Sequence, residues 1–272
     1  MHSIVRICRF GALACALFTG ACTSTPPTMR GGARVERVDK EFDIAEGVTR
    51  IAIDNPWGEI NVRGQDEREV GIHAVIQHLP PRFPRVEFRS RRDGDTFRID
   101  VIVNGATPGD EPKPARADIA VYVPGDLALA LSSRDGRIAA KRRAGPIEAT
   151  TDSGEIHASS LGRLQLRSRS GQIRAIAIGR RWQGESDIAT DSGRIVLLVP
   201  TFGDIALDAR TRGRLTSGFG LSIHDQTDGE HEAHARYGAG TSPLHVRSTS
   251  GEIVLEQLVL LGDDTELPED DD

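Results

Sequence analysis

The sequence predicts an all-β fold built from a stacked repeat. One short phrase returns along the chain: a polar residue or two, a glycine, one variable residue and an aliphatic residue, with a spacing of about 19 residues. The pieces between these phrases alternate apolar and polar residues, as half-buried strands do. Glycine is abundant, at 29 of 272 residues, whereas aromatic residues make up only 4%. Short strands, recurring turns and a thin aliphatic interior favour stacked β-strands.

The glycines of this phrase, which we call the turn glycines, recur from the first third of the chain to its end. They are Gly58, Gly136, Gly154, Gly171, Gly193, Gly213 and Gly251. Because glycine adopts positive φ without a steric penalty, we expect turns with φ above zero at these positions. In a stack, each turn glycine should also meet the equivalent glycine of the next copy.

Each repeat unit contains two strand-like pieces. In one unit, Ile147, Ala149, Ile156 and Ala158 should point inward. Two arrangements fit this pattern: a β-solenoid, in which equivalent strands stack in parallel, and an antiparallel meander of hairpins. We favour the parallel solenoid, because coil-on-coil stacking selects one turn at one period. The antiparallel meander produces nearly the same spacing and remains the alternative arrangement.

The residues after the turn glycines distinguish these two arrangements. In a parallel solenoid they form one outward column, in which Arg137 lies beside Glu155. In a meander the same residues belong to alternate strands and lie about twice the strand spacing of 4.8 Å apart.

The start of the chain has the features of a secretory signal peptide over residues 1–21. Arginines at positions 6 and 9 precede an apolar run that is too short to remain as a membrane-spanning helix. The stretch that ends in Cys22 resembles the lipobox of bacterial lipoproteins, although Thr19 stands where leucine is usual. The resemblance implies cleavage before Cys22 and its acylation, for example with palmitate. Because Thr23 rather than aspartate follows, it also implies an outer-membrane lipoprotein of the cell envelope.

The cysteine count agrees with an acyl anchor. Cys8 and Cys15 would leave with the signal peptide, so only Cys22 would remain and no disulfide could form within one chain. Acylation explains a lone cysteine, and acyl chains would attach the mature protein to a membrane without spanning it. Cleavage by an ordinary signal peptidase stays open.

The remaining chain divides into three parts. Residues 22–34 are the acylated cysteine and a polar linker rich in proline and glycine. Residues 35–258 form one β-strand-repeat domain, whose longer strands before residue 125 should cap the first coil. A separate β-sandwich over residues 35–125 is the alternative. Residues 259–272 are an acidic tail that we expect to be disordered.

The charge of the chain is concentrated at its end. The formal net charge is −6. The acidic residues of the tail contribute −7, so the rest of the chain has a net charge of +1. These acidic residues are Asp263, Asp264, Glu266, Glu269, Asp270, Asp271 and Asp272. Such a block is usually solvated, and no basic patch suggests nucleic acid as a partner.

Residues 54–64, Asp-Asn-Pro-Trp-Gly-Glu-Ile-Asn-Val-Arg-Gly, and the later Thr/Ser-x-Ser-Gly-x-Ile copies resemble the bacterial β-strand-repeat family named putative adhesin, a domain of unknown function. The resemblance extends over residues 45–256. It implies a right-handed β-solenoid-like fold, an envelope location and no established catalysis.

Two sequence motifs could indicate other chemistry. Asp152-Ser153-Gly154 and Asp191-Ser192-Gly193 match the Asp-Ser-Gly core of aspartic proteases, but they lie on equivalent turns of the repeat, and turn chemistry explains them. Residues 224–234 are rich in His, Asp and Glu but lack the spacing of calcium or zinc sites. We interpret residues 227–233 as a worn repeat, and we expect no catalytic, cofactor-binding or metal-binding residue.

Three functions are compatible with the sequence. The leading hypothesis is a lipid-anchored, non-enzymatic scaffold that binds or adheres to an envelope protein or a glycan. The second is a carbohydrate-active enzyme of the β-helix type, for which Glu148, Glu155 and Asp187 are candidates. The third is an accessory factor in envelope stress or assembly.

Overall fold

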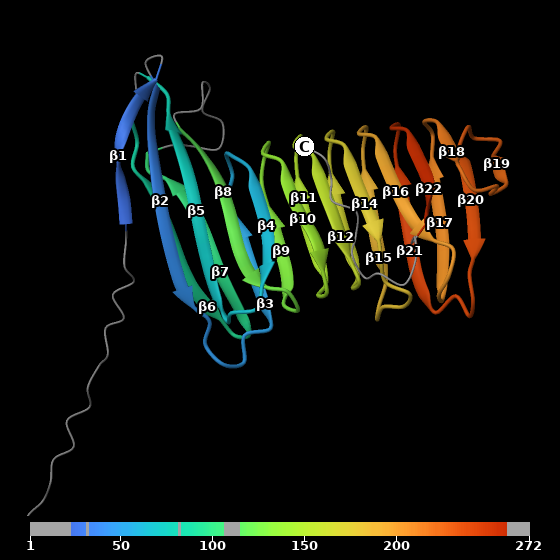
Figure 1. Ribbon diagram of the computed structural model, residues 1–272. Helices are drawn as coiled ribbons and strands as arrows, with labels where there is room; N and C mark the ends of the chain where they lie inside the picture. Colours follow the sequence, from blue (N-terminus) through green and yellow to red (C-terminus); the bar gives the residue numbers. More distant parts are fainter. Residues whose placement is uncertain (1–22, 31–32, 81–82, 106–114, 260–272) are drawn as a thin grey trace, which may run out of the picture.

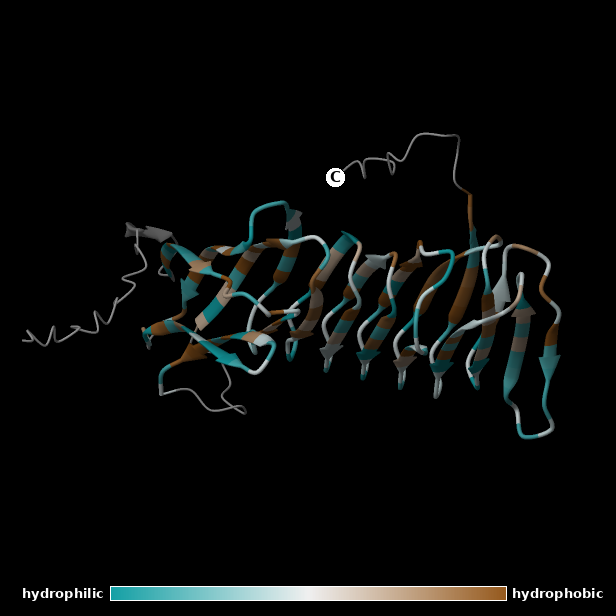
Figure 2. Ribbon diagram, turned by 90° about the horizontal axis from the view of Figure 1, so that it is seen from below, coloured by the Kyte–Doolittle hydropathy of each residue, from teal (hydrophilic) through white to brown (hydrophobic). Residues whose placement is uncertain are grey.

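The computed structural model describes residues 23–30, 33–80, 83–105 and 115–259. Within these ranges the chain is all-β and contains no helix, which confirms the predicted fold class. The predicted signal peptide, Cys22 and residues 260–272 of the tail lie outside the described residues. The strands form two sheets of eleven strands each, and the coils follow one another as layers along an elongated molecule (Figures 1 and 2).

The first sheet contains all seven strands that follow the turn glycines. Its spatial order is β1 (Thr23–Arg30), β2 (Ala33–Asp43), β5 (Glu69–His78), β8 (Ala115–Pro124), β4 (Ile60–Gln65), β10 (Ile138–Arg143), β12 (Ile156–Ser160), β14 (Ile173–Ala177), β16 (Ile195–Pro200), β22 (Ile253–Leu258) and β18 (Leu215–Ser217).

The second sheet contains all seven strands that precede the turn glycines. Its spatial order is β19 (Ile223–Asp225), β20 (His231–Arg236), β17 (Ile205–Thr211), β21 (Ser242–Ser248), β15 (Ser186–Thr190), β13 (Leu164–Ser168), β11 (Ile147–Thr151), β9 (Ala128–Ser132), β3 (Arg50–Asp54), β7 (Thr96–Val103) and β6 (Val86–Asp93).

In the middle of the molecule, successive strands alternate between the sheets and equivalent strands pair in parallel. Ile156 of β12 lies opposite Ile138 of β10 on one side and Ile173 of β14 on the other. In the second sheet, Ile147 of β11 pairs in the same way with Leu129 and Leu164. These residues are buried between the sheets, as the alternation predicts. Each contributes on the order of 1.5–3 kcal/mol through burial.

Both ends of the molecule depart from this parallel pattern: the longer strands before residue 125 pair largely antiparallel, and the expected continuation of the parallel repeat through residues 227–233 is wrong. β1, β2, β5 and β8 pair antiparallel at one end, as do β6 and β7. At the other end, β17, β20 and β19 pair antiparallel. Tight turns explain two of these hairpins, because Gly94 and Gly229 have φ of 62° and 81° between their strands. Residues 227–233 belong to the β19–β20 hairpin and are no worn repeat.

Spatial order also differs from sequence order at the C-terminal end. β21 lies between β15 and β17, and β22 lies between β16 and β18. The last unit of the chain is therefore inserted between two earlier units. At the other end, β7 and β8 lie outside β3 and β4 in the same manner.

The turn glycines form a column, but the expected positive φ is wrong for all of them except Gly58, whose φ is 140°. Close approach is the actual reason for glycine. A Cβ on Gly154 would lie 2.0 Å from the carbonyl oxygen of Gly136, and a Cβ on Gly171 would lie 1.9 Å from that of Gly154. From Gly136 to the end of the stack, the equivalent distances range from 1.6 to 2.3 Å. Any side chain here would overlap the coil below.

A buried hydroxyl fixes most of these turns. Three residues before the glycine, Thr151, Ser168 and Thr190 accept hydrogen bonds from the N–H groups of Gly154, Gly171 and Gly193 at 3.0, 2.8 and 3.0 Å. The repeated motif is therefore Ser/Thr-x-x-Gly. This bond satisfies the backbone donor of a glycine that is buried in the stack.

One buried cation lies where β10 departs from regular pairing. The register between β10 and β12 shifts between Ala140 and Arg143, and the Arg143 side chain turns into the protein. Its guanidinium donates to the carbonyl oxygens of Val123 and Pro124 at 3.3 and 2.5 Å. Burial lowers the pKa of Arg143 to about 10, so the side chain is still protonated at neutral pH.

Candidate binding surface

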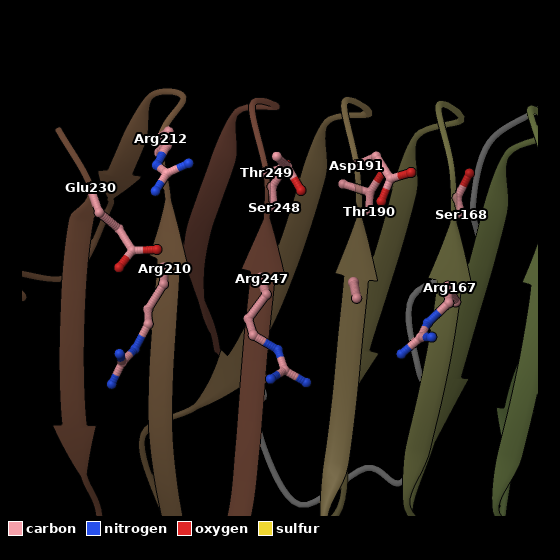
Figure 3. Close-up of a pocket in the computed structure, with 11 residues that line it drawn as sticks. Arg167, Ser168, Thr190, Asp191, Arg210, Arg212, Glu230, Arg247, Ser248 and Thr249 are labelled. Atoms are coloured by element: carbon pink, nitrogen blue, oxygen red, sulfur yellow. The ribbon is translucent and has the colours of Figure 1, made fainter. Parts of the chain in front are cut away.

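One hollow of the described chain lies on the outer face of the second sheet. It has a volume of about 570 Å³ and extends across β13, β15, β21 and β17 near the turns (Figure 3). Four arginines line it together with Ala189, Asp191 and Glu230, and we call it the arginine groove. These arginines are Arg167, Arg210, Arg212 and Arg247.

Strand alternation and register place these side chains. The residues on either side of Arg167, Leu166 and Ser168, are buried, so Arg167 must point outward. Pairing sets Arg167 beside Ala189 and Ala189 beside Arg247. Because the side chain of Ala189 is small, it leaves space between the long side chains of Arg167 and Arg247, which Figure 3 shows on the two flanking strands.

One carboxylate holds two of the arginines. Asp187 Oδ1 accepts a hydrogen bond from Arg247 Nη2 at 2.6 Å, and its Oδ2 lies 3.5 Å from Arg167 Nη2. The arginine side chains remain 57% and 70% exposed, whereas Asp187 is 23% exposed. Asp187 therefore orients two guanidinium groups while their other N–H groups face solvent.

Arg210 continues the row on β17, directly beside Arg247. Its Nε donates to Asp208 Oδ1 at 2.9 Å, and its Nη1 lies 3.2 Å from Glu232 Oε1. The hydrogen bond to Asp208 raises the pKa of Arg210. Burial acts to raise the pKa of Asp208, but the hydrogen bond and charge of Arg210 lower it overall. Both groups are charged at neutral pH.

The groove presents guanidinium groups of Arg167, Arg210 and Arg247 beside carboxylates that they already contact. Guanidinium groups bind carboxylate, sulfate or phosphate through paired N–H donors, and the acids beneath them are already engaged. Arg212 belongs to the same edge and lies 3.6 Å from Asp228.

The three acidic residues suggested for carbohydrate chemistry are not brought together. Glu148 Oε2 accepts a bond of 2.5 Å from Arg50 on the second sheet. Glu155 lies beside the first sheet, 3.5 Å from His157. Asp187 is two strands from Glu148, with Gln165 between them. Each carboxylate has a cationic or imidazole partner of its own.

The two Asp-Ser-Gly turns do not form a protease dyad. The turn that contains Arg169 lies between them, because Ser170 N bonds to Asp152 O and Asp191 N bonds to Arg169 O. Asp152 and Asp191 are therefore separated by two strand spacings, a distance of about 9.6 Å. Carboxylates that share one proton must lie about 3 Å apart.

The histidines of the histidine-rich segment contact neighbouring carboxylates. His231 Nδ1 lies 2.6 Å from Asp225 Oδ1, and His234 Nδ1 lies 3.0 Å from Asp208 Oδ2. Within the described ranges, no group of three or more His, Cys, Asp or Glu side chains could hold a metal ion. Also within those ranges, no helix is long and apolar enough to cross a membrane.

Sequence reasoning did not identify the arginine groove, although a signal was present. Arg167, Arg210 and Arg247 each precede a buried Ser168, Thr211 or Ser248 that bonds to a turn glycine. Alignment of the repeats on this hydroxyl would have placed the three arginines in one outward column. Their true neighbours would still have been wrong, because the insertion of β21 sets the order.

Comparison with known proteins gives only distant likenesses. No protein-family model matches the chain, and no curated protein does. A putative cell adhesion protein from Clostridium sporogenes ATCC 15579 is similar in structure, with 10% identity, a TM-score of 0.45, and coverage of 81% of this chain and 99% of that chain.

Two further solved structures are similar over most of the chain. A putative adhesin from Bacteroides fragilis NCTC 9343 has 8% identity, covers 82% of this chain and 97% of that chain, and has a TM-score of 0.33. A putative lipid binding protein from Parabacteroides distasonis ATCC 8503 has 12% identity, the same coverage of 82% and 97%, and a TM-score of 0.32. A likeness of this degree indicates no shared function.

Proposed function

We propose that this protein is a non-enzymatic binding scaffold of the cell envelope and that the arginine groove is its contact surface for an anionic partner. The proposal rests on one observation: Arg167 and Arg247, which lie on either side of Ala189, both contact the carboxylate of Asp187. Arg210 adds a third guanidinium in the same row. A partner with regularly spaced carboxylate or sulfate groups, such as an acidic glycan, fits this arrangement.

The stacked strands explain why such a site would be rigid. Each groove residue lies on a strand with hydrogen-bonded neighbours, and Asp187 and Asp208 hold the guanidinium groups before any partner arrives. Binding then costs little side-chain ordering. Because the contacts are ionic and exposed, the affinity should fall with salt.

Binding of polygalacturonate, a polymer of carboxylates, tests the groove. We expect the wild type to bind this polymer in 50 mM salt by calorimetry, whereas neutral dextran should not bind. Arg167→Gln with Arg247→Gln should weaken binding about tenfold or more, as expected from loss of two charged contacts.

A matched control lies at the far end of the same sheet. Arg91 and Arg98 share Asp100 in the way that Arg167 and Arg247 share Asp187. Arg91→Gln with Arg98→Gln should leave binding unchanged. An equal loss of polygalacturonate binding in both double variants would show a non-specific charge effect. Unchanged binding by Arg167→Gln with Arg247→Gln would contradict the proposal.

We also propose that the protein is a lipoprotein of the outer membrane, with residues 1–21 as signal peptide, 22–34 as linker and 35–258 as one domain. The lipobox-like stretch and the lone mature cysteine support acylation of Cys22. The parallel registers of the middle strands support a β-solenoid core with a unit of about 19 residues, for which we propose a right-handed coil. Metabolic labelling with a palmitate analogue should mark the wild type and not Cys22→Ser, and an unlabelled wild type would refute the anchor.

A further inference from the structure

Two histidines lie beside the arginine groove, in a row of side chains on the outer face of the second sheet. His245 on β21 pairs in register with Asp187 on β15 and with Asp208 on β17, and His234 on β20 pairs with the other side of Asp208. The residues on either side of His245 are buried, so its side chain points outward, and the register places the other three on the same face. We call Asp187, His245, Asp208 and His234 the histidine–aspartate row.

This row runs alongside the arginines of the groove. Arg247 follows His245 by two residues on β21, and Arg210 follows Asp208 by two residues on β17, a separation of about 7 Å along each strand. Asp187 and Asp208 are also the carboxylates that accept hydrogen bonds from Arg247 and Arg210, at 2.6 and 2.9 Å. Each histidine therefore neighbours a carboxylate that also holds a guanidinium group.

The surroundings of His245 in the described chain are mostly acidic. Asp187 and Asp208 flank it on the two neighbouring strands, and Glu185 Oε1, just before β15, lies 2.7 Å from its Nε2. On its own strand, the next outward residue is Arg247. The side chain of His245 is 31% exposed, so protons from solvent reach it. A proton on this imidazole places a positive charge among three carboxylates.

His234 occupies a similar position at the end of the row. Its Nδ1 lies 3.0 Å from Asp208 Oδ2, and its Nε2 lies 3.5 Å from Glu232 Oε2. The other charged or titratable side chains near it are Arg236 on its own strand and His224 on β19, which pairs in register with Glu232. The side chain of His234 is about half exposed, so it is also open to solvent.

Asp208 couples the histidines to the arginines electrostatically. Burial acts to raise the pKa of Asp208, but the hydrogen bond and charge of Arg210 lower it, and the charges of His234 and His245 lower it further. Asp208 therefore stays ionised in mildly acidic solution. The groups of the row that change charge between pH 5 and pH 8 are the histidines, since imidazole is the side chain that ordinarily titrates there.

Three guanidinium groups of the groove are balanced by three carboxylates. The guanidinium groups belong to Arg167, Arg210 and Arg247, and the carboxylates that they contact belong to Asp187, Asp208 and Glu232. These six groups together have no net charge while both histidines are neutral, so they attract a distant anion only weakly. A proton on each histidine adds two positive charges to the same face.

On the basis of the anion-binding function proposed above, we propose that protonation of His234 and His245 strengthens the binding of an anionic partner in the arginine groove. The two charges offset the carboxylates of Asp187 and Asp208. N–H groups of the guanidinium groups that these carboxylates hold then donate to the partner instead. The groove thus binds its partner more tightly at pH 5.5 than at pH 7.5.

Binding of dextran sulfate by the full chain at these two pH values tests the effect. Sulfate esters stay ionised at both values, so only the protein changes its charge. In 50 mM salt, we expect calorimetry to show that the wild type binds about fivefold or more tightly at pH 5.5, because two charges are added close to the anion. His234→Gln with His245→Gln should bind equally at the two pH values.

A permanent charge at position 245 distinguishes this effect from a merely structural role of the imidazole. His245→Lys keeps a cation between Asp187 and Asp208 at both pH values. At pH 7.5 this variant should bind dextran sulfate about twofold or more tightly than the wild type, and its affinity should change less with pH. Weaker binding by His245→Lys than by the wild type at pH 7.5 would contradict the proposal.

A matched control lies on the opposite sheet. His73 Nδ1 lies 2.7 Å from Asp39 Oδ1 on the outer face of the first sheet, and both side chains are exposed. His73→Gln should therefore keep the full pH dependence of binding, and its loss in this variant would count against the groove histidines.

The remaining outcomes separate the histidines from the groove itself. Equal affinity of the wild type at pH 5.5 and pH 7.5 would refute the role of the histidines and leave anion binding by the groove intact. A pH dependence that persists in His234→Gln with His245→Gln would also refute it. No binding of dextran sulfate at either pH would overturn the anion-binding function and the role of the histidines together.

Discussion

Replacement of Gly154 by alanine tests why the turn glycines are glycine. The new Cβ would lie 2.0 Å from the carbonyl oxygen of Gly136 and 2.9 Å from Thr151 Oγ1. Backbone groups cannot rotate away as a flexible side chain can, so the coil that contains Gly154 must move by about 1 Å or more. The hydrogen bonds on both sides of the coil oppose this movement.

The magnitude follows from those hydrogen bonds. Ile138 N bonds to Glu155 O at 2.8 Å, and Ile156 N bonds to Gln172 O at 2.9 Å. A shift of about 1 Å would stretch one of them beyond hydrogen-bonding distance and leave buried groups unpaired, at about 1–3 kcal/mol. Overpacking adds about 1–3 kcal/mol. We expect a loss of roughly 4 kcal/mol and a fall in melting temperature of roughly 10 °C.

Thermal and urea unfolding measure this loss against two controls. A Cβ on Gly125 would meet nothing within 4 Å and φ is not positive, so Gly125→Ala should change stability by less than about 1 kcal/mol. Gly94 has φ of 62° and open space, so Gly94→Asn should be tolerated whereas Gly154→Asn should not. If Gly154→Ala and Gly125→Ala have the same melting temperature and the same urea midpoint, the close-approach argument is refuted.

Three further predictions follow from the described contacts. Arg194→Cys with Glu252→Cys should form a disulfide in mild oxidant. Arg194→Cys with Arg214→Cys should not, because β22 lies between the two strands and doubles their separation to about 9.6 Å. A crosslink between positions 194 and 214 would contradict the strand order. Arg143→Met should cost about 2–4 kcal/mol in urea unfolding, because its buried carbonyl partners lose their donors; an unchanged stability would contradict this. His157 has a lowered pKa, so its contribution to stability is complete above the ordinary pKa of about 6.5 and is lost as pH falls below it. Between pH 7 and pH 5, the melting temperature of the wild type should therefore fall further than that of His157→Gln. An equal fall in both proteins would refute this.

The sequence predicts the fold as far as local patterns reach. The alternation around Ile147 and Ile156 indicates the buried faces, because a strand has a period of two and only one face meets the core. The recurrence of Gly154 indicates a stacked turn, but not why glycine is required. Positive φ and close approach both select glycine, and only coordinates distinguish them.

The candidate site was less predictable, because it depends on which strands become neighbours. Asp187 was identified as an outward acid, yet its partner Arg247 lies 60 residues away in the sequence. Without the insertion of β21 beside β15, Arg247 would not reach Asp187 and the groove would have no second wall. Local patterns do not specify such an insertion, since every unit presents similar strand edges.

Charge differs between otherwise similar strand edges. In sequence order, Arg194 would stack directly beside Arg214, and like charges in adjacent strands are destabilising. In the structure, Glu252 lies between them and its carboxylate is 3.0 Å from Arg194 Nε. At the start of the same column, Arg137 lies 3.8 Å from Glu59, which precedes it in space. Each exposed pair contributes no more than about 1 kcal/mol, so these pairs are too weak to create the stack. The same insertion sets Arg247 directly beside Arg210 in the second sheet, where Asp187 and Asp208 supply the opposing charges. Like charges on neighbouring strands are thus accompanied by a carboxylate in both sheets.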